Sequence, residues 1–121
     1  LALGVHAKTG ALVLALPGNP ASALLTFTLF GVPLLRALQG DEQPLPRTLS
    51  LPLASPYKKK AGRLEFVRAK LEGGPTGPVV RPLENQASGA LTSLAWSDVL
   101  ALIPCDAELV EAGTSVEVLP L

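Results

Sequence analysis

The apolar positions of this chain follow one pattern in the first forty residues and another from residue 47 onward. Residues 11–16 form a continuous apolar run, which is typical of a strand covered on both faces in a parallel sheet. From residue 21 the apolar side chains recur at helical spacing, and Gly40 marks the expected end. The first forty residues therefore predict a strand, a turn and a helix.

The turn between these elements has the sequence Leu-Pro-Gly-Asn-Pro at residues 16–20. Asn19 is placed to cap the helix, and Pro20 occupies its first position, where a missing N–H costs nothing. Pro33 predicts a kink or the beginning of a second segment, because its ring clashes with the preceding turn. The apolar stretch of residues 21–35 has about 15 residues, fewer than a membrane span needs. We therefore expect a buried helix and no membrane segment.

The predicted helix is apolar nearly all round, since Arg36 is the only charged residue from Ala21 to Gln39. Such a helix must be covered on several sides. A chain of 121 residues has too little material to cover this helix and a flanking strand. We expect the cover to come from another part of a longer protein or from a second subunit. The absence of Met and of any signal peptide also favours a fragment.

A polar, proline-rich hinge at residues 41–47 precedes a region of short strands and turns. A loop is clearest at residues 73–78, a short helix or turn is expected at residues 88–95, and a turn at residues 111–114. The predicted strands are Thr48–Ala54, Arg63–Leu71, Val79–Leu83, Val99–Ile103 and Ser115–Leu119. Five strands in such a short region favour a small barrel or a folded sheet.

Composition restricts the classes of function. Ten Lys plus Arg balance ten Asp plus Glu, which argues against nucleic-acid binding by phosphate neutralisation. The single Cys105 excludes an internal disulfide and a multi-cysteine metal site; we interpret it as a small buried apolar residue in a reducing, cytoplasmic setting. His6 is the only histidine, and an exposed strand or turn residue is its favoured interpretation over catalysis.

The turn at residues 16–20 is the clearest candidate for a ligand-binding site. Ligands of open α/β sheets bind outside the carboxyl ends of the strands, and a glycine such as Gly18 lets a ligand approach the backbone. The amides that open the helix favour an anion, and the two prolines restrict the loop before a ligand arrives. A rigid helix start with an Asn cap explains the same residues without a ligand. Both interpretations stay open.

The Tyr-Lys-Lys-Lys sequence of residues 57–60 is interpreted as the solvated end of a hairpin. Its functional alternative is electrostatic attraction of a phosphorylated substrate, because like charges in a cluster raise the local concentration of anions.

Several ordered segments resemble the MoeA and gephyrin E-domain family, whose members are molybdopterin molybdenumtransferases. They are the turn and helix of residues 16–40, the Gly-Arg-Leu-Glu-Phe-Val-Arg strand of residues 62–68, the Gln-Ala-Ser-Gly of residues 86–89 and the closing segment of residues 109–118. The resemblance covers essentially the whole chain. Ala87 departs from it, because the family commonly has Gly there.

The resemblance implies an α/β fragment followed by an all-β domain. Residues 1–46 would be the strand–loop–helix end of a three-layer α/β/α molybdopterin-binding domain, and residues 47–121 a small barrel-like C-terminal domain. The implied enzyme is a cytoplasmic homodimer that inserts molybdate into adenylated molybdopterin and releases AMP, assisted by Mg²⁺. The family's catalytic and metal-binding acidic residues precede the Leu-Pro-Gly-Asn-Pro turn. We therefore assign no catalytic residue and no metal ligand here, and expect the chain alone to be inactive.

Substrate-binding roles carried over from the family fall on Pro17, Gly18, Asn19, Pro20, Arg68 and Ser88. The prolines would shape a loop in the pterin cleft, and the glycine and asparagine would offer hydrogen bonds. Arg68 could hold a phosphate or molybdate, and Ser88 could donate a hydroxyl hydrogen bond. A solvated or salt-bridged surface arginine and a turn serine are the alternatives. A non-catalytic scaffold of the gephyrin kind and a stand-alone small-ligand module remain competing functions.

Overall fold

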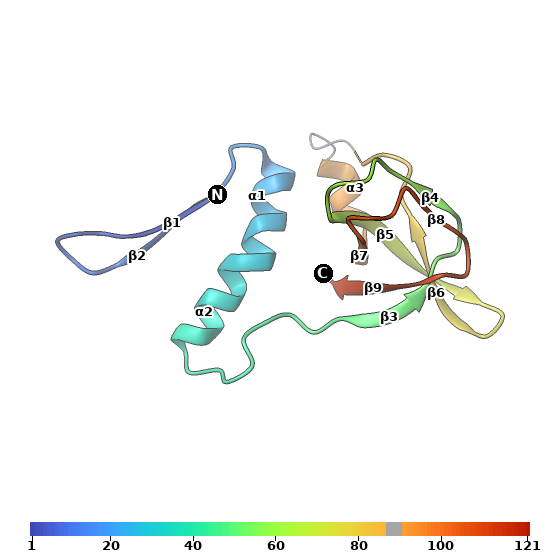
Figure 1. The fold of residues 1–121 in the computed structure, drawn as a ribbon. Helices are drawn as coiled ribbons and strands as arrows, with labels where there is room; N and C mark the ends of the chain where they lie inside the picture. The colour runs from blue at the N-terminus through green and yellow to red at the C-terminus, as the bar shows by residue number, and fades with distance from the viewer. Residues whose placement is uncertain (87–90) are drawn as a thin grey trace. The chain divides into compact units, whose positions relative to one another are not determined.

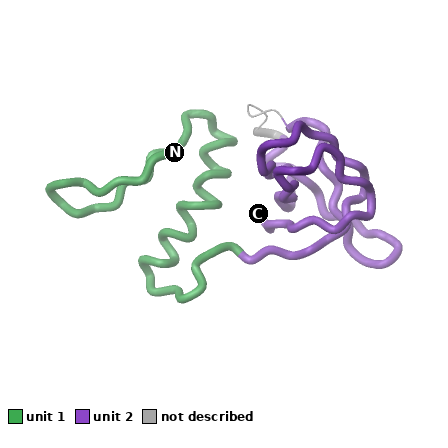
Figure 2. Tube along the Cα trace, in the orientation of Figure 1, with its two compact units in different colours: residues 1–46 green, residues 47–121 purple. Residues whose placement is uncertain are grey.

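The computed structural model describes residues 1–86 and 91–121 (Figure 1). The chain forms two compact units, residues 1–46 and residues 47–121 (Figure 2). The first unit contains strands β1 (Ala2–Val5) and β2 (Leu12–Ala15), followed by helix α1 (Pro20–Thr26), a π-helical segment η1 (Phe27–Gly31) and helix α2 (Val32–Leu38). The predicted strand, turn and helix are therefore present.

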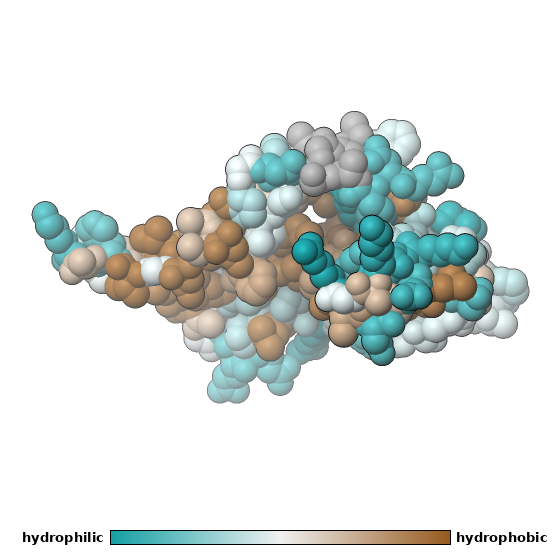
Figure 3. Space-filling view, turned by 45° about the horizontal axis from the view of Figure 1, so that its top comes forward, coloured by the Kyte–Doolittle hydropathy of each residue, from teal (hydrophilic) through white to brown (hydrophobic). Residues whose placement is uncertain are grey.

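Strands β1 and β2 form an antiparallel hairpin with Ala2 opposite Ala15 and Val5 opposite Leu12. The hairpin closes because His6 N donates to Ala11 O at 2.8 Å and Gly10 adopts a φ of 70°. Both strands are exposed apart from the half-buried Leu14. Apolar side chains consequently gather on the surface of the hairpin (Figure 3, brown, left). The prediction of a parallel partner and of cover on both faces is not met within this chain.

The helical stretch confirms where helical segments were predicted to begin and end. Pro33 lies in the first turn of α2, directly after the π-helical segment, as expected for the start of a second segment. At the C-terminal end, Gly40 N donates to Ala37 O and Asp41 N to Arg36 O, both at 3.0 Å, while Gly40 has a φ of 86°. This is a Schellman motif, for which glycine is the favoured residue. Arg36 also pairs with Asp41 at 2.6 Å.

Within the described residues, the continuous helical stretch Pro20–Leu38 meets the criteria of length and composition for a membrane span. It has 19 residues and a mean hydropathy of 1.6, and it extends beyond the apolar stretch of residues 21–35 at both ends. Length and composition are weak arguments for a span, because the core helix of a soluble protein meets the same criteria.

The second unit is a curled antiparallel sheet with the strand order β3-β9-β7-β5-β6. Its strands are β3 (Leu49–Pro52), β5 (Glu65–Gly74), β6 (Gly77–Pro82), β7 (Val99–Ile103) and β9 (Ser115–Pro120). Leu53, just after β3, forms a bridge with Val80 in β6, so the two ends of the sheet meet. This confirms the five predicted strands and the barrel-like expectation.

Three shorter elements complete the second unit. Strands β4 (Tyr57–Lys58) and β8 (Leu109–Val110) pair with each other, and helix α3 (Leu91–Ala95) precedes β7. Neither β4 nor β8 was predicted, because two residues give too little pattern to recognise. Helix α3 agrees with the short helix expected for residues 88–95, as far as these are described.

The predicted loop at residues 73–78 is mostly strand. Gly74 at the end of β5 pairs with Gly77 at the start of β6, so only Pro75 and Thr76 form the turn. Glycine permits this tight return at both ends. Gly77 has a φ of 138°, and a Cβ on Gly74 would lie 2.7 Å from the Val79 side chain.

One apolar cluster forms the core of the second unit. Its buried members are Leu53, Val67, Ala69, Val80, Val99, Ala101, Ile103, Val110, Val116 and Val118. Because side chains alternate along a strand, Arg68 in β5 points to the opposite face from its neighbours in this cluster. Leu100 lies directly opposite Arg68 in the sheet and is also buried.

Candidate functional site

The turn at residues 16–20 is built around the side chain of Asn19. Its Oδ1 accepts hydrogen bonds from Ala21 N at 3.1 Å and from Ser22 N at 3.2 Å, which confirms the predicted cap. These two helix-opening amides are thus already occupied, and Pro20 has none. An anion at this turn would have to meet the amides of Gly18 and Asn19 instead, which corrects the expectation that the helix itself presents its first amides.

Gly18 is exposed, and a Cβ built on it would meet nothing within 4 Å. It also lies outside the glycines with positive φ, so its backbone conformation is open to other residues. Neither packing nor backbone geometry within this chain therefore calls for glycine at this position. The position instead leaves the main chain open to close approach by another group, as a binding turn requires.

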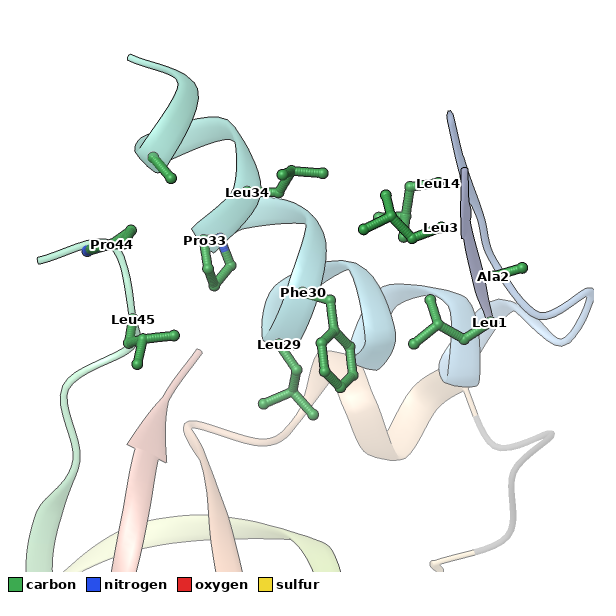
Figure 4. Close-up of a pocket in the computed structure, with 11 residues that line it drawn as sticks. Leu1, Ala2, Leu3, Leu14, Leu29, Phe30, Pro33, Leu34, Pro44 and Leu45 are labelled. Atoms are coloured by element: carbon green, nitrogen blue, oxygen red, sulfur yellow. The ribbon is translucent and has the colours of Figure 1, made fainter. Parts of the chain in front are cut away.

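A hollow of about 500 Å³ lies beside the helix of the first unit (Figure 4). Its lining comprises Leu1, Ala2, Leu3, Leu14, Leu29, Phe30, Pro33, Leu34, Ala37, Pro44 and Leu45. The lining contains none of the turn residues 17–20 and no ionisable side chain. It offers mainly apolar surface and no polar side chain to orient a substrate, so we do not assign it as the ligand site.

Arg68 lies in β5 and is only 7% exposed, so the alternative of a solvated surface arginine was wrong. Its main-chain N donates to Gln86 Oε1 at 3.0 Å, and its Nε donates to the same oxygen at 3.4 Å. Gln86 Nε2 donates in return to Arg68 O at 2.9 Å and to Leu83 O at 2.7 Å. The carboxamide thus holds the main chain of Arg68, the residue Leu83 after β6 and the arginine side chain together.

The remaining predicted site residue, Ser88, lies outside the described residues. The turn at residues 17–20 belongs to the first unit and Arg68 to the second. A common site formed by the turn, Arg68 and Ser88 therefore stays a prediction.

The lysine run lies at the β4–β8 pair. Lys58 and Lys60 are exposed, as predicted for a solvated end, whereas Lys59 Nζ donates to the carbonyls of Lys60 at 3.2 Å and Ala107 at 3.3 Å. Tyr57 is instead half-buried and donates its hydroxyl to Glu65 Oε2 at 3.2 Å. Burial, and then the negative charge of Glu65, raise the pKa of Tyr57 above its ordinary value.

Two single residues have different outcomes. His6 is exposed at the end of β1, where its Nδ1 lies 2.8 Å from Thr9 Oγ1, in agreement with the turn interpretation. Cys105 is exposed, so the prediction of a buried apolar residue was wrong. It lies in the turn that follows β7, and its carbonyl accepts from Gly62 N at 2.7 Å.

The described residues contain no group of three or more His, Cys, Asp or Glu side chains that could hold a metal ion.

Sequence reasoning missed two side chains that organise the second unit. Gln86 was considered only as part of a motif, although its carboxamide holds Arg68. Asp98 links β5 to the C-terminal residue, because its Oδ2 accepts from Leu71 N at 3.0 Å and its carbonyl accepts from Leu121 N at 3.1 Å. No local pattern marks either residue, since their partners lie far along the chain.

Comparisons with known proteins agree with this architecture. The family described as the MoeA C-terminal region (domain IV) matches residues 50–121. The molybdopterin molybdenumtransferase of Synechococcus elongatus is 42% identical over 108 residues, which are 88% of this chain and 25% of that protein. Molybdopterin molybdenumtransferase 1 of Mycobacterium tuberculosis is 32% identical over 120 residues, which are 95% of this chain and 28% of that protein.

A solved structure shares the fold. The crystal structure of the molybdopterin biosynthesis MoeA protein from "Pyrococcus horikosii" covers 98% of this chain with a TM-score of 0.72 and 34% identity. The matched part is 28% of that protein. This chain likewise spans about a quarter of the length of the curated relatives that it matches.

Proposed function

This chain belongs to the MoeA family, and we propose that it forms the C-terminal part of a molybdopterin molybdenumtransferase. The complete enzyme would insert molybdate into adenylated molybdopterin and release AMP, in the biosynthesis of the molybdenum cofactor. The observation that carries the proposal is the match of residues 50–121 to the MoeA C-terminal region. The names of the relatives supply the reaction class.

The turn at residues 17–20 supports a binding role in this enzyme. Gly18 is exposed, and nothing in its packing or backbone conformation requires glycine. In the proposal, the amides of Gly18 and Asn19 donate to the substrate, and Pro17 and Pro20 hold the turn in one conformation. The Asn19 side chain contributes by holding the start of the helix, because its oxygen is committed to the cap.

The apolar hairpin supports the proposed three-layer α/β/α domain. The register places Leu3, Val5, Leu12 and Leu14 on one face of the hairpin and Ala2, Gly4, Val13 and Ala15 on the other. Apolar side chains on both faces are typical of strands that are covered on both sides. We propose that further strands and a second helical layer, outside this chain, complete the cover. The stretch Pro20–Leu38 is then a core helix of a cytoplasmic protein.

We further propose that the enzyme acts as a homodimer and that Mg²⁺ assists the reaction. The described residues contain no group of three or more His, Cys, Asp or Glu side chains that could hold the ion, and in the proposal its ligands lie outside this chain. No step of the proposal assigns a catalytic acid or base to these 121 residues. Their part is to bind and orient the substrate. In the proposal, Arg68 and Ser88 help to bind an anionic group of that substrate.

Purification of the complete protein and measurement of molybdate-dependent AMP release from adenylated molybdopterin tests the function. Gly18→Ala should lower the specificity constant about tenfold or more, because the added methyl group blocks the approach to the main chain. Gly73→Ala is a matched control, since its Cβ also meets nothing within 4 Å. The 121-residue chain alone should be inactive. Absence of AMP release from the complete, folded protein would contradict the proposal.

A further inference from the structure

We infer that Gln86 is a positioning residue, which fixes the direction of the Arg68 guanidinium without neutralising its charge. The inference rests on the proposed function, in which Arg68 binds an anionic group of the substrate. It adds a residue whose action is exerted through Arg68 and not on the substrate itself.

Three of the four hydrogen bonds of the Gln86 carboxamide go to Arg68, and the fourth goes to Leu83 O. Pairing of β5 with β6 begins at Ala69 opposite Pro82, and Leu83 N donates to Arg68 O at 2.8 Å. Beyond this point, the Gln86 side chain makes the hydrogen bonds to β5 that a further residue of β6 would otherwise make. Its oxygen accepts from Arg68 N at 3.0 Å, and its nitrogen donates to Arg68 O at 2.9 Å. Both main-chain polar groups of Arg68 are thus held by one side chain.

The same oxygen also reaches the arginine side chain. Gln86 Oε1 accepts from Arg68 Nε at 3.4 Å, a long hydrogen bond that sets the orientation of the planar guanidinium. Because Nε is fixed in the plane, the directions of the two terminal nitrogens are restricted as well. Arg68 is only 7% exposed, so a wrongly directed guanidinium would find little water to solvate it.

The chemical identity of the partner matters as much as its position. A carboxylate in the place of the Gln86 amide would also accept from Nε, but it would pair with the positive charge and weaken attraction for an anion. A carboxamide orients the arginine and leaves its charge unchanged. An apolar side chain of similar length, such as Met, would also leave the charge unchanged but could not orient the arginine through this hydrogen bond.

A double-mutant cycle in the complete protein tests this role, with Gln86→Met, Arg68→Met and the combined variant. KM and kcat are measured for adenylated molybdopterin and for molybdate. We expect Gln86→Met to raise the KM for one of these anions about tenfold, the scale of a hydrogen bond to a charged group. In the Arg68→Met background, Gln86→Met should have no further effect, because a positioning residue acts only through its target.

Gln86→Glu separates orientation from charge. It retains the accepting oxygen, so a KM increase at least as large as that of Gln86→Met is expected from neutralisation of Arg68. Arg81→Met is the control, since Arg81 is an arginine of the neighbouring strand that pairs with Glu72 on the surface. Its KM should equal that of the wild type. Thermal unfolding of each variant corrects for the folded fraction.

The Arg68 Nε–H of the 121-residue chain provides a readout that does not depend on activity. Its exchange with water, followed by NMR, should be slow in the wild type and fast in Gln86→Met. Equal exchange in the two proteins, or a KM effect of Gln86→Met that persists without Arg68, would overturn the inference while leaving the enzyme function intact. An inactive wild-type protein would instead overturn the proposed function, and the exchange measurement would still decide whether Gln86 holds Arg68.

Discussion

The two units of the chain bury their apolar side chains to very different extents. Of the 19 large apolar side chains that are exposed among the described residues, 13 lie in residues 1–46 and six in residues 47–121. The second unit encloses a cluster of ten buried residues, whereas the helices of the first unit bury only Ala21, Gly31 and Pro33. The second unit therefore supplies its own core, and the first does not.

This difference shows that local sequence signals and long-range contacts determine different features of the fold. The helical stretch of the first unit has well-formed ends, because caps and turns depend on residues that are close in sequence. Local signals add little stability without packing, since most helical stability comes from a covered apolar face. The second unit is held by pairing between distant strands, which closes a core.

Separation of the two units should have the largest effect. Residues 47–121 alone are expected to unfold in one cooperative transition, because their core is complete. Residues 1–46 alone should show no cooperative transition. Thermal unfolding followed by circular dichroism checks both expectations, with the 121-residue chain as the reference. A sharp transition for the isolated residues 1–46 would show that their local contacts suffice.

Removal of a large side chain should distinguish the units next. Leu53 is 2% exposed and lies where the sheet closes, so Leu53→Ala should lower the unfolding free energy by about 2–5 kcal/mol. Leu38 is 62% exposed, and Leu38→Ala is the control with the same chemical change. Its effect should stay within about 0.5 kcal/mol. Denaturant titration measures both, and equal losses would contradict the contrast.

A smaller effect is expected at the tight hairpin of the second unit. Gly74→Ala places a methyl group 2.7 Å from the Val79 side chain and 2.9 Å from the carbonyl of Gly77. The resulting strain should lower the unfolding free energy by about 1–3 kcal/mol. Gly73→Ala, one residue earlier in the same strand, has open space and should be nearly neutral. Chemical denaturation of the two variants tests whether the end of β5 requires glycine at position 74 and not at position 73.

The smallest expected effect concerns pH. The folded state raises the pKa of Tyr57, so above about pH 10 the unfolded chain releases the proton first. Tyr57 therefore contributes stability fully below that pH and loses it as pH rises through the folded pKa. Tyr57→Phe should be less stable by about 1 kcal/mol at neutral pH, because the hydrogen bond to Glu65 is lost. Its deficit should shrink in alkaline solution, and a deficit that grows there would contradict this assignment.

The sequence was sufficient where local chemistry decides the structure. Asn19 and Pro20 were predicted to mark the start of the helix and Gly40 its end, and the structure confirms these roles. The five strands of the curled sheet were also predicted, because alternation and intervening turns mark them. A continuous apolar run such as residues 11–16, however, does not reveal the direction of its partner, and here that partner is antiparallel.

The candidate site could be predicted only in part, for a similar reason. The turn at residues 17–20 is visible in the sequence because glycine and proline have distinct backbone properties. Arg68 is hydrogen-bonded by Gln86, which lies 18 residues further along the chain. The exposure of Cys105 depends on where the turn after β7 leaves the core. Neither environment is encoded by neighbours in the sequence.

The β5–β6 hairpin extends beyond the rest of its sheet, since β7 pairs with β5 only as far as Ala69. The turn residues Pro75 and Thr76 are exposed. Chain added between them would lengthen a surface loop, and loop closure becomes costlier only slowly with length. This hairpin tip is consequently a suitable place to insert an epitope or a fluorescent reporter while the barrel keeps its packing.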